Sequence, residues 1–308
     1  MQKLNIAGGP EQASRLILGC MRMPALTKEA AAEMIETATE LGINFFDHAT
    51  CYGGGEAETR FGEALALTSL KREDMIIQSK CGLRFENQTF DWSKDYILES
   101  VDGILQRLKM EYLDVLLLHR PDLLFEPEEV AEAFDTLEKA GKVRHFGVSN
   151  TTPMQIELLK KYVKQPLQIN QLQLSLEQSQ LIDQELYLNN KTTDMSVMRD
   201  GGLLDYCRLN DITIQAWSPL QHGMFGGMFV DNPDFPEINK ALGELAEQYG
   251  VTKTAIAIAW ILRHPAKMQV IAGTMNPTHL KEMAEADRIC LTREEWYRLY
   301  LASGKFLP

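Results

Sequence analysis

The chain has 308 residues, of which 45% are hydrophobic and 24% are charged, and its formal net charge is −12. These values are typical of a water-soluble globular protein, and the length suits either two domains or one large α/β barrel. The negative charge argues against a nucleic acid or an anionic membrane as a partner, because both require a basic face.

The chain contains five cysteines, an odd number, and no two of them have a metal-ligand spacing such as Cys-x-x-Cys. We therefore expect reduced thiols and no metal site. The N-terminus lacks the long apolar segment of a signal peptide, and no apolar run is long enough to span a membrane. These features predict a cytoplasmic protein without a membrane partner, and they leave its oligomeric state open.

Short apolar runs that are typical of strands alternate with segments whose apolar residues recur at helical spacing. Up to residue 140 the predicted elements are a strand at 15–19, a helix at 27–41, a strand at 44–47, a helix at 56–67, a strand at 75–80, a helix at 93–108, a strand at 114–118 and a helix at 127–140.

The alternation continues to the end of the chain. The predicted elements are a strand at 145–149, a helix at 152–163, a strand at 168–171, a long irregular loop at 176–198, a helix at 202–209, a strand at 213–217, a loop at 220–235, helices at 236–249 and 252–263, a strand at 269–272 and helices at 278–284 and 292–301.

Eight strand-and-helix alternations without a break in composition predict a TIM (β/α)8 barrel, with one domain over residues 1–308. Residues 4–12 are expected to add a short N-terminal hairpin across the barrel bottom, and the last helix is an extra C-terminal one. The competing doubly wound sheet requires a Gly-x-Gly-x-x-Gly turn. Gly53-Gly54-Gly55 is followed by Glu56, Ala57 and Glu58, so this spacing is absent.

Polar residues follow three neighbouring predicted strands, at the barrel rim where this fold carries its chemistry. Asp47, Lys80 and His119 come at or just after these strand ends, and Tyr52 lies in the loop after Asp47. Taken singly, each also fits an ordinary structural role, such as a cap, a solvated strand end or a turn residue. Taken together they favour a site, because a buried Lys80 needs a carboxylate and Asp47 is the natural candidate.

These four residues suit proton donation to a carbonyl oxygen. A nearby ammonium is expected to lower the pKa of the Tyr52 phenol, Asp47 holds that ammonium, and His119 can orient a substrate oxygen. The set contains no nucleophile–base pair for acyl transfer. Because it also lacks a reductant, it implies a nicotinamide cofactor. The adjacent His48 is either a strand-end hydrogen bonder or a residue that shapes the site beside Tyr52.

Several motifs occur in order along the chain: Gly-Ile-Asn-Phe-Phe-Asp at 42–47, Tyr-Gly at 52–53, Ser-Lys-Cys-Gly at 79–82, Leu-Leu-His-Arg-Pro-Asp at 117–122, Gly-Lys-Val-Arg-His-Phe-Gly-Val-Ser-Asn at 141–150, Trp-Ser-Pro-Leu at 217–220 and Ile-Ala-Gly-Thr at 271–274. Through these motifs the sequence resembles the aldo-keto reductase family from about residue 16 to about residue 283. Asp-His-Ala at 47–49 with Tyr-Gly-Gly at 52–54, and Trp-Tyr-Arg at 296–298, are similar to a bacterial subgroup of oxidoreductases related to YdhF.

This resemblance implies a catalytic tetrad of Asp47, Tyr52, Lys80 and His119, with Tyr52 as general acid. It also implies a seat for NADPH, in which successive segments hold the nicotinamide carboxamide, the nicotinamide ring, the pyrophosphate and the adenosine phosphate. The matching residues are Ser149, Asn150 and Gln171 for the carboxamide, Trp217 for the ring, Ser218 and Leu220 for the pyrophosphate, and Gly273, Thr274 and His279 for the adenosine phosphate.

The last of these segments departs from the family pattern. The family often has a Lys or Arg in this loop, where the present chain has Gly273 and then His279. Thr274, His279 and Lys281 are weak partners for the dianionic 2′-phosphate. NADPH is therefore the expected cofactor, and NADH is a possible one.

The resulting functional hypothesis is an NAD(P)H-dependent reductase of aldehyde or ketone carbonyls, with a small-molecule substrate that the sequence does not identify. The alternative is a cofactor-loaded redox sensor or regulatory subunit with little turnover, and a third hypothesis is a barrel of unrelated chemistry, such as an isomerase. Several Met and aromatic residues suggest an apolar substrate pocket. Its expected walls are Met21, Met23, 85–92, 123–125 and Phe306.

Overall fold

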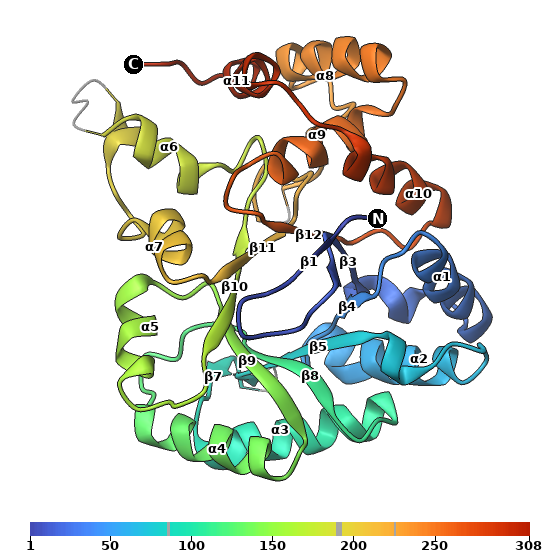
Figure 1. Cartoon of the computed structure of the whole chain (residues 1–308), viewed down its shortest axis with the longest axis vertical. Helices are drawn as coiled ribbons and strands as arrows, with labels where there is room; N and C mark the ends of the chain where they lie inside the picture. The colour runs from blue at the N-terminus through green and yellow to red at the C-terminus, as the bar shows by residue number, and fades with distance from the viewer. Residues whose placement is uncertain (85–86, 189–192, 225) are drawn as a thin grey trace.

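The computed structural model describes residues 1–84, 87–188, 193–224 and 226–308. Eight parallel strands close into a barrel in the spatial order β10-β11-β12-β3-β4-β5-β8-β9, which confirms the predicted fold (Figure 1). The barrel strands are β3 (Leu16–Gly19), β4 (Phe45–Asp47), β5 (Ile76–Cys81), β8 (Leu113–Leu118), β9 (Val143–Ser149), β10 (Leu167–Gln173), β11 (Thr213–Trp217) and β12 (Gln269–Ala272).

Helices surround the barrel and link its strands (Figure 1). Thr27, Thr152, Thr252 and Thr292 each cap a helix by accepting a bond from the backbone N–H three residues later. The α-helices are α1 (Lys28–Glu40), α2 (Glu56–Leu65), α3 (Lys94–Leu108), α4 (Pro127–Lys139), α5 (Pro153–Lys160), α6 (Gln180–Leu186), α7 (Leu203–Leu209), α8 (Pro236–Tyr249), α9 (Lys253–Leu262), α10 (Pro277–Ala284) and α11 (Arg293–Ala302).

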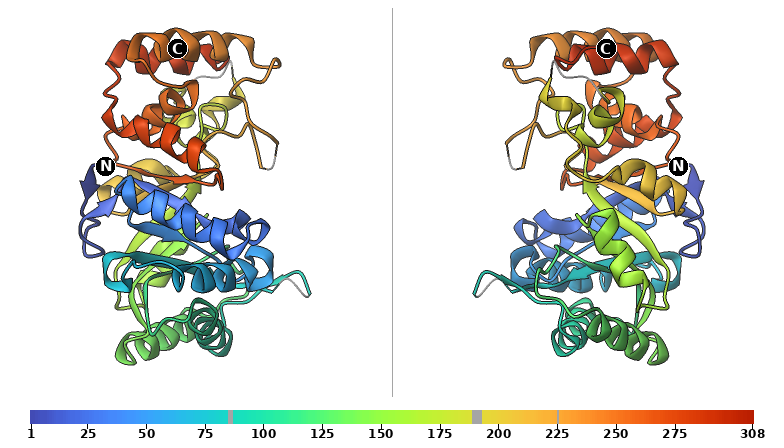
Figure 2. Two further views of the ribbon diagram at one scale, coloured as in Figure 1. Left: turned by 90° about the vertical axis from the view of Figure 1, so that its right-hand side faces the viewer. Right: turned by 90° about the vertical axis from the view of Figure 1, so that its left-hand side faces the viewer.

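The predicted N-terminal hairpin is present. It consists of β1 (Lys3–Leu4) and β2 (Ala13–Ser14), which pair antiparallel, and it crosses the barrel opening that faces the viewer in Figure 1. A second hairpin, β6 (Leu83–Arg84) with β7 (Thr89–Phe90), and the loop after β11 project on the opposite side of the molecule (Figure 2). That opposite side is the rim formed by the C-terminal strand ends, where the polar residues are expected.

The predicted extra C-terminal helix, α11, packs against α9. The indole rings of Trp260 and Trp296 stack with centroids 4.9 Å apart. Each indole N–H also donates to the other residue's backbone carbonyl, at 3.1 Å from Trp260 and 3.0 Å from Trp296. Both indole N–H groups are thereby satisfied, and α11 is held against α9.

The expected irregular loop at 176–198 is wrong in part, because it contains α6 and a short 3₁₀ helix, η4 (Asp194–Ser196); residues 189–192 lie outside the described residues. The buried Asp183 of α6 accepts bonds from the hydroxyls of Ser179 and of Tyr300 in α11, each at 2.9 Å. A helix this short depends on such tertiary contacts, which local sequence does not reveal.

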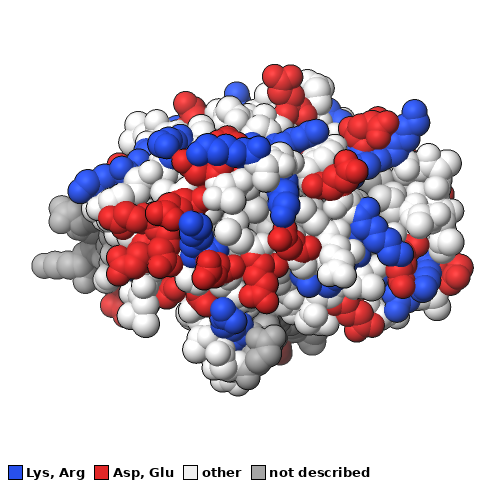
Figure 3. Space-filling view, turned by 90° about the horizontal axis from the view of Figure 1, so that it is seen from below, with Lys and Arg blue, Asp and Glu red and all other residues white. Residues whose placement is uncertain are grey.

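The surface seen in Figure 3 carries Lys and Arg side chains beside Asp and Glu side chains, without a continuous basic area on that face. In the described part of the chain, no helix is both long and apolar enough to cross a membrane.

Candidate active site

Two neighbouring strand ends join a lysine to a carboxylate inside the barrel. Lys80 of β5 is fully buried, and its Nζ lies 2.6 Å from Oδ1 and 2.7 Å from Oδ2 of Asp47 at the end of β4. The third ammonium proton reaches the backbone carbonyl of His48 at 2.8 Å. All three donors of the ammonium are satisfied, so the pair has the hydrogen bonding that a buried ion pair requires.

A chain of buried amides holds this carboxylate from below. Asp47 Oδ1 also accepts bonds from Gln78 Nε2 at 2.6 Å and from Gln171 Nε2 at 3.0 Å. Both amide nitrogens also donate to Gln215 Oε1, which links β5 and β10 to β11. The network then runs from Gln215 Nε2 to Gln269 Oε1 at 3.0 Å, and from Gln269 Nε2 to the Ser14 carbonyl at 2.7 Å. These bonds hold Asp47 in one orientation, although the buried Gln78 Oε1 has no partner among the described residues.

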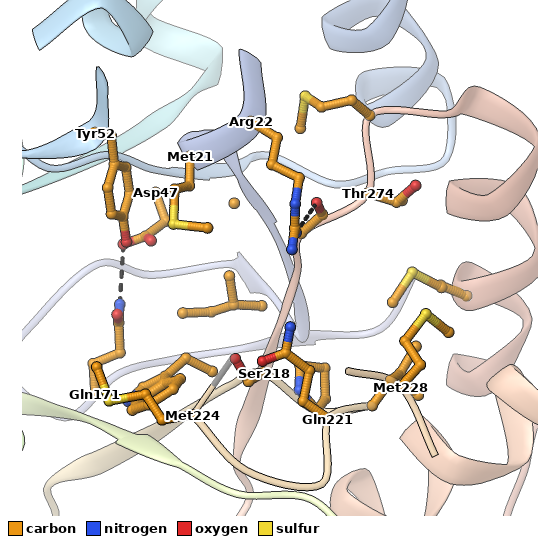
Figure 4. A pocket seen from close by; sticks show the side chains of 18 of the residues that line it. Met21, Arg22, Asp47, Tyr52, Gln171, Ser218, Gln221, Met224, Met228 and Thr274 are labelled. Carbon is orange, nitrogen blue, oxygen red and sulfur yellow. Dashed lines mark hydrogen bonds between the residues drawn. The ribbon is translucent and has the colours of Figure 1, made fainter. Parts of the chain in front are cut away.

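Tyr52 owes its place to three glycines. Gly53, Gly54 and Gly55 have φ values of 60°, 63° and 93°, which residues with a Cβ adopt only with strain. They form the tight turn η2 (Tyr52–Gly55) between the loop after β4 and α2. The Tyr52 ring centroid lies 4.9 Å from Lys80 Nζ and 6.1 Å from the His119 ring centroid. Tyr52 and Asp47 lie side by side at one wall of a cavity (Figure 4).

The predicted lowering of the Tyr52 pKa is wrong. Burial, with the Asp47 carboxylate nearby, raises the pKa of the Tyr52 phenol well above 10. Lys80 is bound to Asp47, and its ammonium does not offset the effect of burial on the pKa of the phenol. A phenol with a raised pKa keeps its proton near neutral pH but is a weaker acid, so proton donation by Tyr52 requires that the tyrosinate be stabilised as it forms.

His119 is neutral in this arrangement. Burial, Lys80 and Arg120 all lower the pKa of His119 well below 6.5. Its Nδ1 lies 3.5 Å from the Cys51 sulfur. A neutral imidazole has one donor nitrogen and one acceptor nitrogen, so His119 can hydrogen-bond a substrate oxygen without competing as a stronger acid.

The amide side of the site is built around Asn150, which has the left-handed φ of 55° that Asn tolerates better than most residues. Its Nδ2 donates to Ser149 Oγ at 2.8 Å, and its Oδ1 accepts from the Trp217 indole N–H at 3.2 Å. Ser149 Oγ donates to the Gln171 carbonyl at 2.9 Å. Because Gln171 Nε2 is already bound to Asp47 and Gln215, the free acceptor of that amide is Oε1.

A cavity of about 1130 Å³ joins these groups, and its lining extends from Tyr52 past Trp217 to the loop after β12. Lys80 does not line it, because Lys80 is buried behind Asp47. The residues that line it as predicted are Asp47, Tyr52, His119, Ser149, Asn150, Gln171, Trp217, Ser218, Leu220, Gly273, Thr274 and His279.

The expected pocket walls are only partly found. Met21 lines the cavity, whereas Met23 is fully buried in the core. Residues 87–92, 123–125 and Phe306 are not among the lining residues, and Phe85 and Glu86 lie outside the described residues. Other methionines take their place, from the loops after β11 and β12 and from α10: Met224, Met228, Met275 and Met283.

Sequence reasoning missed Arg22, which lies in η1 (Cys20–Ala25) directly after β3. Its Nη1 donates to the Gly273 carbonyl at 3.0 Å, which joins the segments that follow the paired strands β3 and β12; Arg22 lines the cavity (Figure 4). A Cβ on Gly273 would lie 3.1 Å from the same nitrogen, so glycine leaves the space that this guanidinium uses. No described carboxylate forms an ion pair with Arg22. The strand-end rule that identified Asp47 also applies to this position.

Lys281, expected beside the adenosine phosphate, is exposed and does not belong to the cavity lining described here. Thr274 and His279 do line it. Arg22, from the far end of the sequence, is therefore the cation that faces the loop after β12.

Neither interpretation of His48 is confirmed. The ring is fully buried behind the site and forms a T-shaped contact with the Phe61 ring, at a centroid distance of 4.7 Å. Neither ring nitrogen has a hydrogen-bond partner among the described residues. Burial, with the Lys80 charge, lowers the pKa of His48 to about 3.

We expect His48→Met to make the protein's stability less sensitive to acid. The unfolded chain takes up a proton at His48 below about pH 6.5, but the folded chain resists protonation until about pH 3. Stability is therefore lost as the pH falls through this window. Between pH 7 and pH 5, the free energy of unfolding should fall by about 2 kcal/mol more in the wild type than in the variant. Urea unfolding at both pH values measures this; an equal fall in both proteins would contradict it.

Comparison with known proteins gives a consistent result. A model of the Aldo/keto reductase family matches residues 15–300. Oxidoreductase YdhF of Escherichia coli (strain K12) is 34% identical over 313 residues, which cover 98% of each chain. A 6-dehydroglucose reductase of Agrobacterium fabrum is 33% identical over 318 residues, which cover 99% of each chain. The crystal structure of the thermostable aldo-keto reductase Tm1743 with the inhibitor epalrestat has a TM-score of 0.78 and 27% identity, and the match covers 98% of this chain and 100% of that one.

Proposed function

Since the chain belongs to the aldo/keto reductase family and is thus an oxidoreductase, we propose that it reduces aldehyde or ketone carbonyls to alcohols with NADPH as reductant. We also propose that residues 1–308 form one domain with one active site. The observation that carries the proposed reduction is Tyr52 beside the buried Asp47–Lys80 pair, in the lining of a cavity of about 1130 Å³.

The donor set of the cavity fits a nicotinamide dinucleotide. Trp217 offers a flat apolar face for the nicotinamide ring. The hydroxyl of Ser149 and the amides of Asn150 and Gln171 match the donors and acceptors of a carboxamide. Ser218 follows β11 directly, has a left-handed φ of 52°, and lines the same cavity as Trp217 and the loop after β12. Arg22 provides a cation for the phosphates in that cavity.

In this proposal the bound cofactor supplies the hydride that reaches the carbonyl carbon. Tyr52 donates its phenolic proton to the carbonyl oxygen as negative charge develops there. Lys80, held by Asp47, keeps a positive charge next to the phenol and stabilises the tyrosinate that remains. Neutral His119 orients the carbonyl oxygen toward Tyr52.

The experiment that tests the function is a reduction assay of the purified protein with NADPH over a panel of aldehydes, ketones and quinones. We expect enzyme-dependent consumption of NADPH with at least one class and formation of the corresponding alcohol. The name of the Agrobacterium relative, 6-dehydroglucose reductase, makes oxidised sugars a sensible part of the panel. Absence of both cofactor binding and alcohol formation throughout would contradict the proposal.

We expect Arg22→Gln to weaken the binding of NADPH and of NADH by a similar factor, about tenfold. Arg22 lies next to Gly273, near the end of β12, and faces Gln221 in the loop after β11 (Figure 4). This position suits the pyrophosphate, which both cofactors carry, and a charge-assisted hydrogen bond contributes about 1.5–3 kcal/mol. Fluorescence titration of the protein with each cofactor gives the two dissociation constants.

The matched control is Lys28→Gln, which also removes a positive charge. Lys28 is the first residue of α1, shortly after the segment η1 that contains Arg22, and it is exposed and lies outside the cavity. Its dissociation constants should equal those of the wild type. A loss confined to NADPH in Arg22→Gln would assign the guanidinium to the 2′-phosphate instead. Unchanged binding of both cofactors would show that Arg22 does not contact the phosphates.

A further inference from the structure

The substrate end of the cavity contains one charge that the protein does not balance. The charges of Asp47 and Lys80 are paired with each other at 2.6 Å. Tyr52 keeps its proton because its pKa is raised, and His119 is neutral because its pKa is lowered. Around this end of the cavity, the remaining charged side chain among the described lining residues is Arg120.

Arg120 follows His119 directly in the loop after β8 and lines the cavity in a half-buried position. Its guanidinium carbon lies 5.6 Å from the centre of the Trp217 ring. Within the described ranges, no carboxylate forms an ion pair with Arg120, and no protein acceptor forms a hydrogen bond with its guanidinium. Its charge nevertheless acts on Tyr52, since it opposes the rise in the pKa of the phenol.

Other partly buried arginines of the chain have carboxylate partners. Arg107 binds the buried Glu58 at 2.7 Å, and Arg72, at the opposite end of the barrel, binds Asp114 at 2.7 Å. Partial burial of an unpaired charge costs free energy that an incoming anion would recover. The packing on Trp217 does not replace such a partner, because a guanidinium beside an aromatic ring still has in-plane N–H groups to donate.

We propose that Arg120 binds a carboxylate of the carbonyl substrate, so that the preferred substrates are aldehydes or ketones that also carry a carboxylate. The five N–H donors of a guanidinium match the two oxygens of a carboxylate, and Arg120 is adjacent in sequence to the residue that orients the carbonyl oxygen. A local cation is also required to attract an anion to a chain whose net charge is −12. This inference rests on the carbonyl reductase function proposed above.

The test compares substrates that differ in charge but have similar shape. One pair is 4-carboxybenzaldehyde and methyl 4-formylbenzoate; the other is succinic semialdehyde and its methyl ester. In the wild type we expect kcat/KM to be at least tenfold higher for the acid of a pair than for its ester, mainly through a lower KM. In Arg120→Gln that ratio should fall toward one, and added salt should lower it in the wild type.

A binding measurement makes the test independent of turnover. Calorimetry of the enzyme with bound NADPH should give tighter binding of benzoate than of benzamide, and Arg120→Gln should abolish the difference. Arg208→Gln is the control. Arg208 of α7 has an exposed side chain, pairs with Asp205 at 3.1 Å and does not line the cavity. It should retain the preference of the wild type for acids.

The outcomes separate this inference from the function on which it rests. Equal kcat/KM values for acid and ester in the wild type, or a preference for acids that survives in Arg120→Gln, would overturn the role of Arg120 and leave the reductase function intact. Reduction of neither compound in either pair, together with no activity on the wider panel, would overturn both.

Discussion

Tyr52→Phe is expected to lower kcat for carbonyl reduction by about 10²- to 10⁴-fold, the usual contribution of a positioned general acid. The substitution removes only the hydroxyl, and the ring keeps its place against Lys80, at 4.9 Å from Nζ, and against His119. The dissociation constant for NADPH should therefore stay within about twofold of the wild-type value, because other residues form the proposed cofactor seat. Steady-state kinetics and a fluorescence titration on the same preparation measure both quantities.

The pH profile of the wild type adds a second readout to this prediction. The pKa of His119 is lowered well below 6.5 and that of Tyr52 is raised well above 10. Neither group titrates between about pH 6 and pH 9, so kcat/KM for reduction should be level across this range. Turnover of Tyr52→Phe at the wild-type rate would exclude Tyr52 as the proton donor. A wild-type profile with a step near pH 6.5 would show that His119 is not held neutral.

Lys80→Met is expected to lower the free energy of unfolding by about 3–5 kcal/mol, because it leaves the buried carboxylate of Asp47 without its counter-ion. The amides of Gln78 and Gln171 would still donate to Asp47 Oδ1, but they carry no charge. Reduction should be lost as well, since the charge beside Tyr52 is gone. Urea unfolding at neutral pH measures the stability change.

The matched control for this variant is the double substitution Asp47→Asn with Lys80→Met, which removes both charges. Its stability should recover much of the loss, because an uncharged pair avoids the unpaired buried charge. Reduction should remain absent in the double variant. Equal unfolding midpoints for the wild type and Lys80→Met would contradict the buried ion pair.

The barrel and the polar residues of its rim could be predicted because both depend on local patterns. The apolar run of β4 ends at Asp47, that of β8 ends just before His119, and Lys80 lies near the end of β5, so these residues mark the positions where the three strands reach the site. Parallel neighbours then bring these side chains together at one edge. The meeting of these three side chains could therefore be predicted without any prediction of loop structure.

Other features depend on distant packing, and local patterns did not reveal them. The direction of the Tyr52 pKa shift follows from the depth of burial and from the pairing of Lys80 with Asp47. The short helix α6 depends on α11, which lies more than a hundred residues later. The contact of Arg22 with Gly273 joins the segments that follow the first and the last barrel strands. The sequence has glycine where the family often has a cation, and in the structure this glycine leaves room for the guanidinium of Arg22.

The most direct test of the proposed carbonyl reduction uses NADPH with deuterium at the transferable position of nicotinamide C4. After reaction with a reducible aldehyde, we expect mass spectrometry to find one deuterium on the carbinol carbon of the alcohol from the wild type, and at least a hundredfold slower formation of that product with Tyr52→Phe. Tight binding of NADPH without transfer of deuterium to any carbonyl in the panel would contradict the reductase account and favour a cofactor-bound redox sensor.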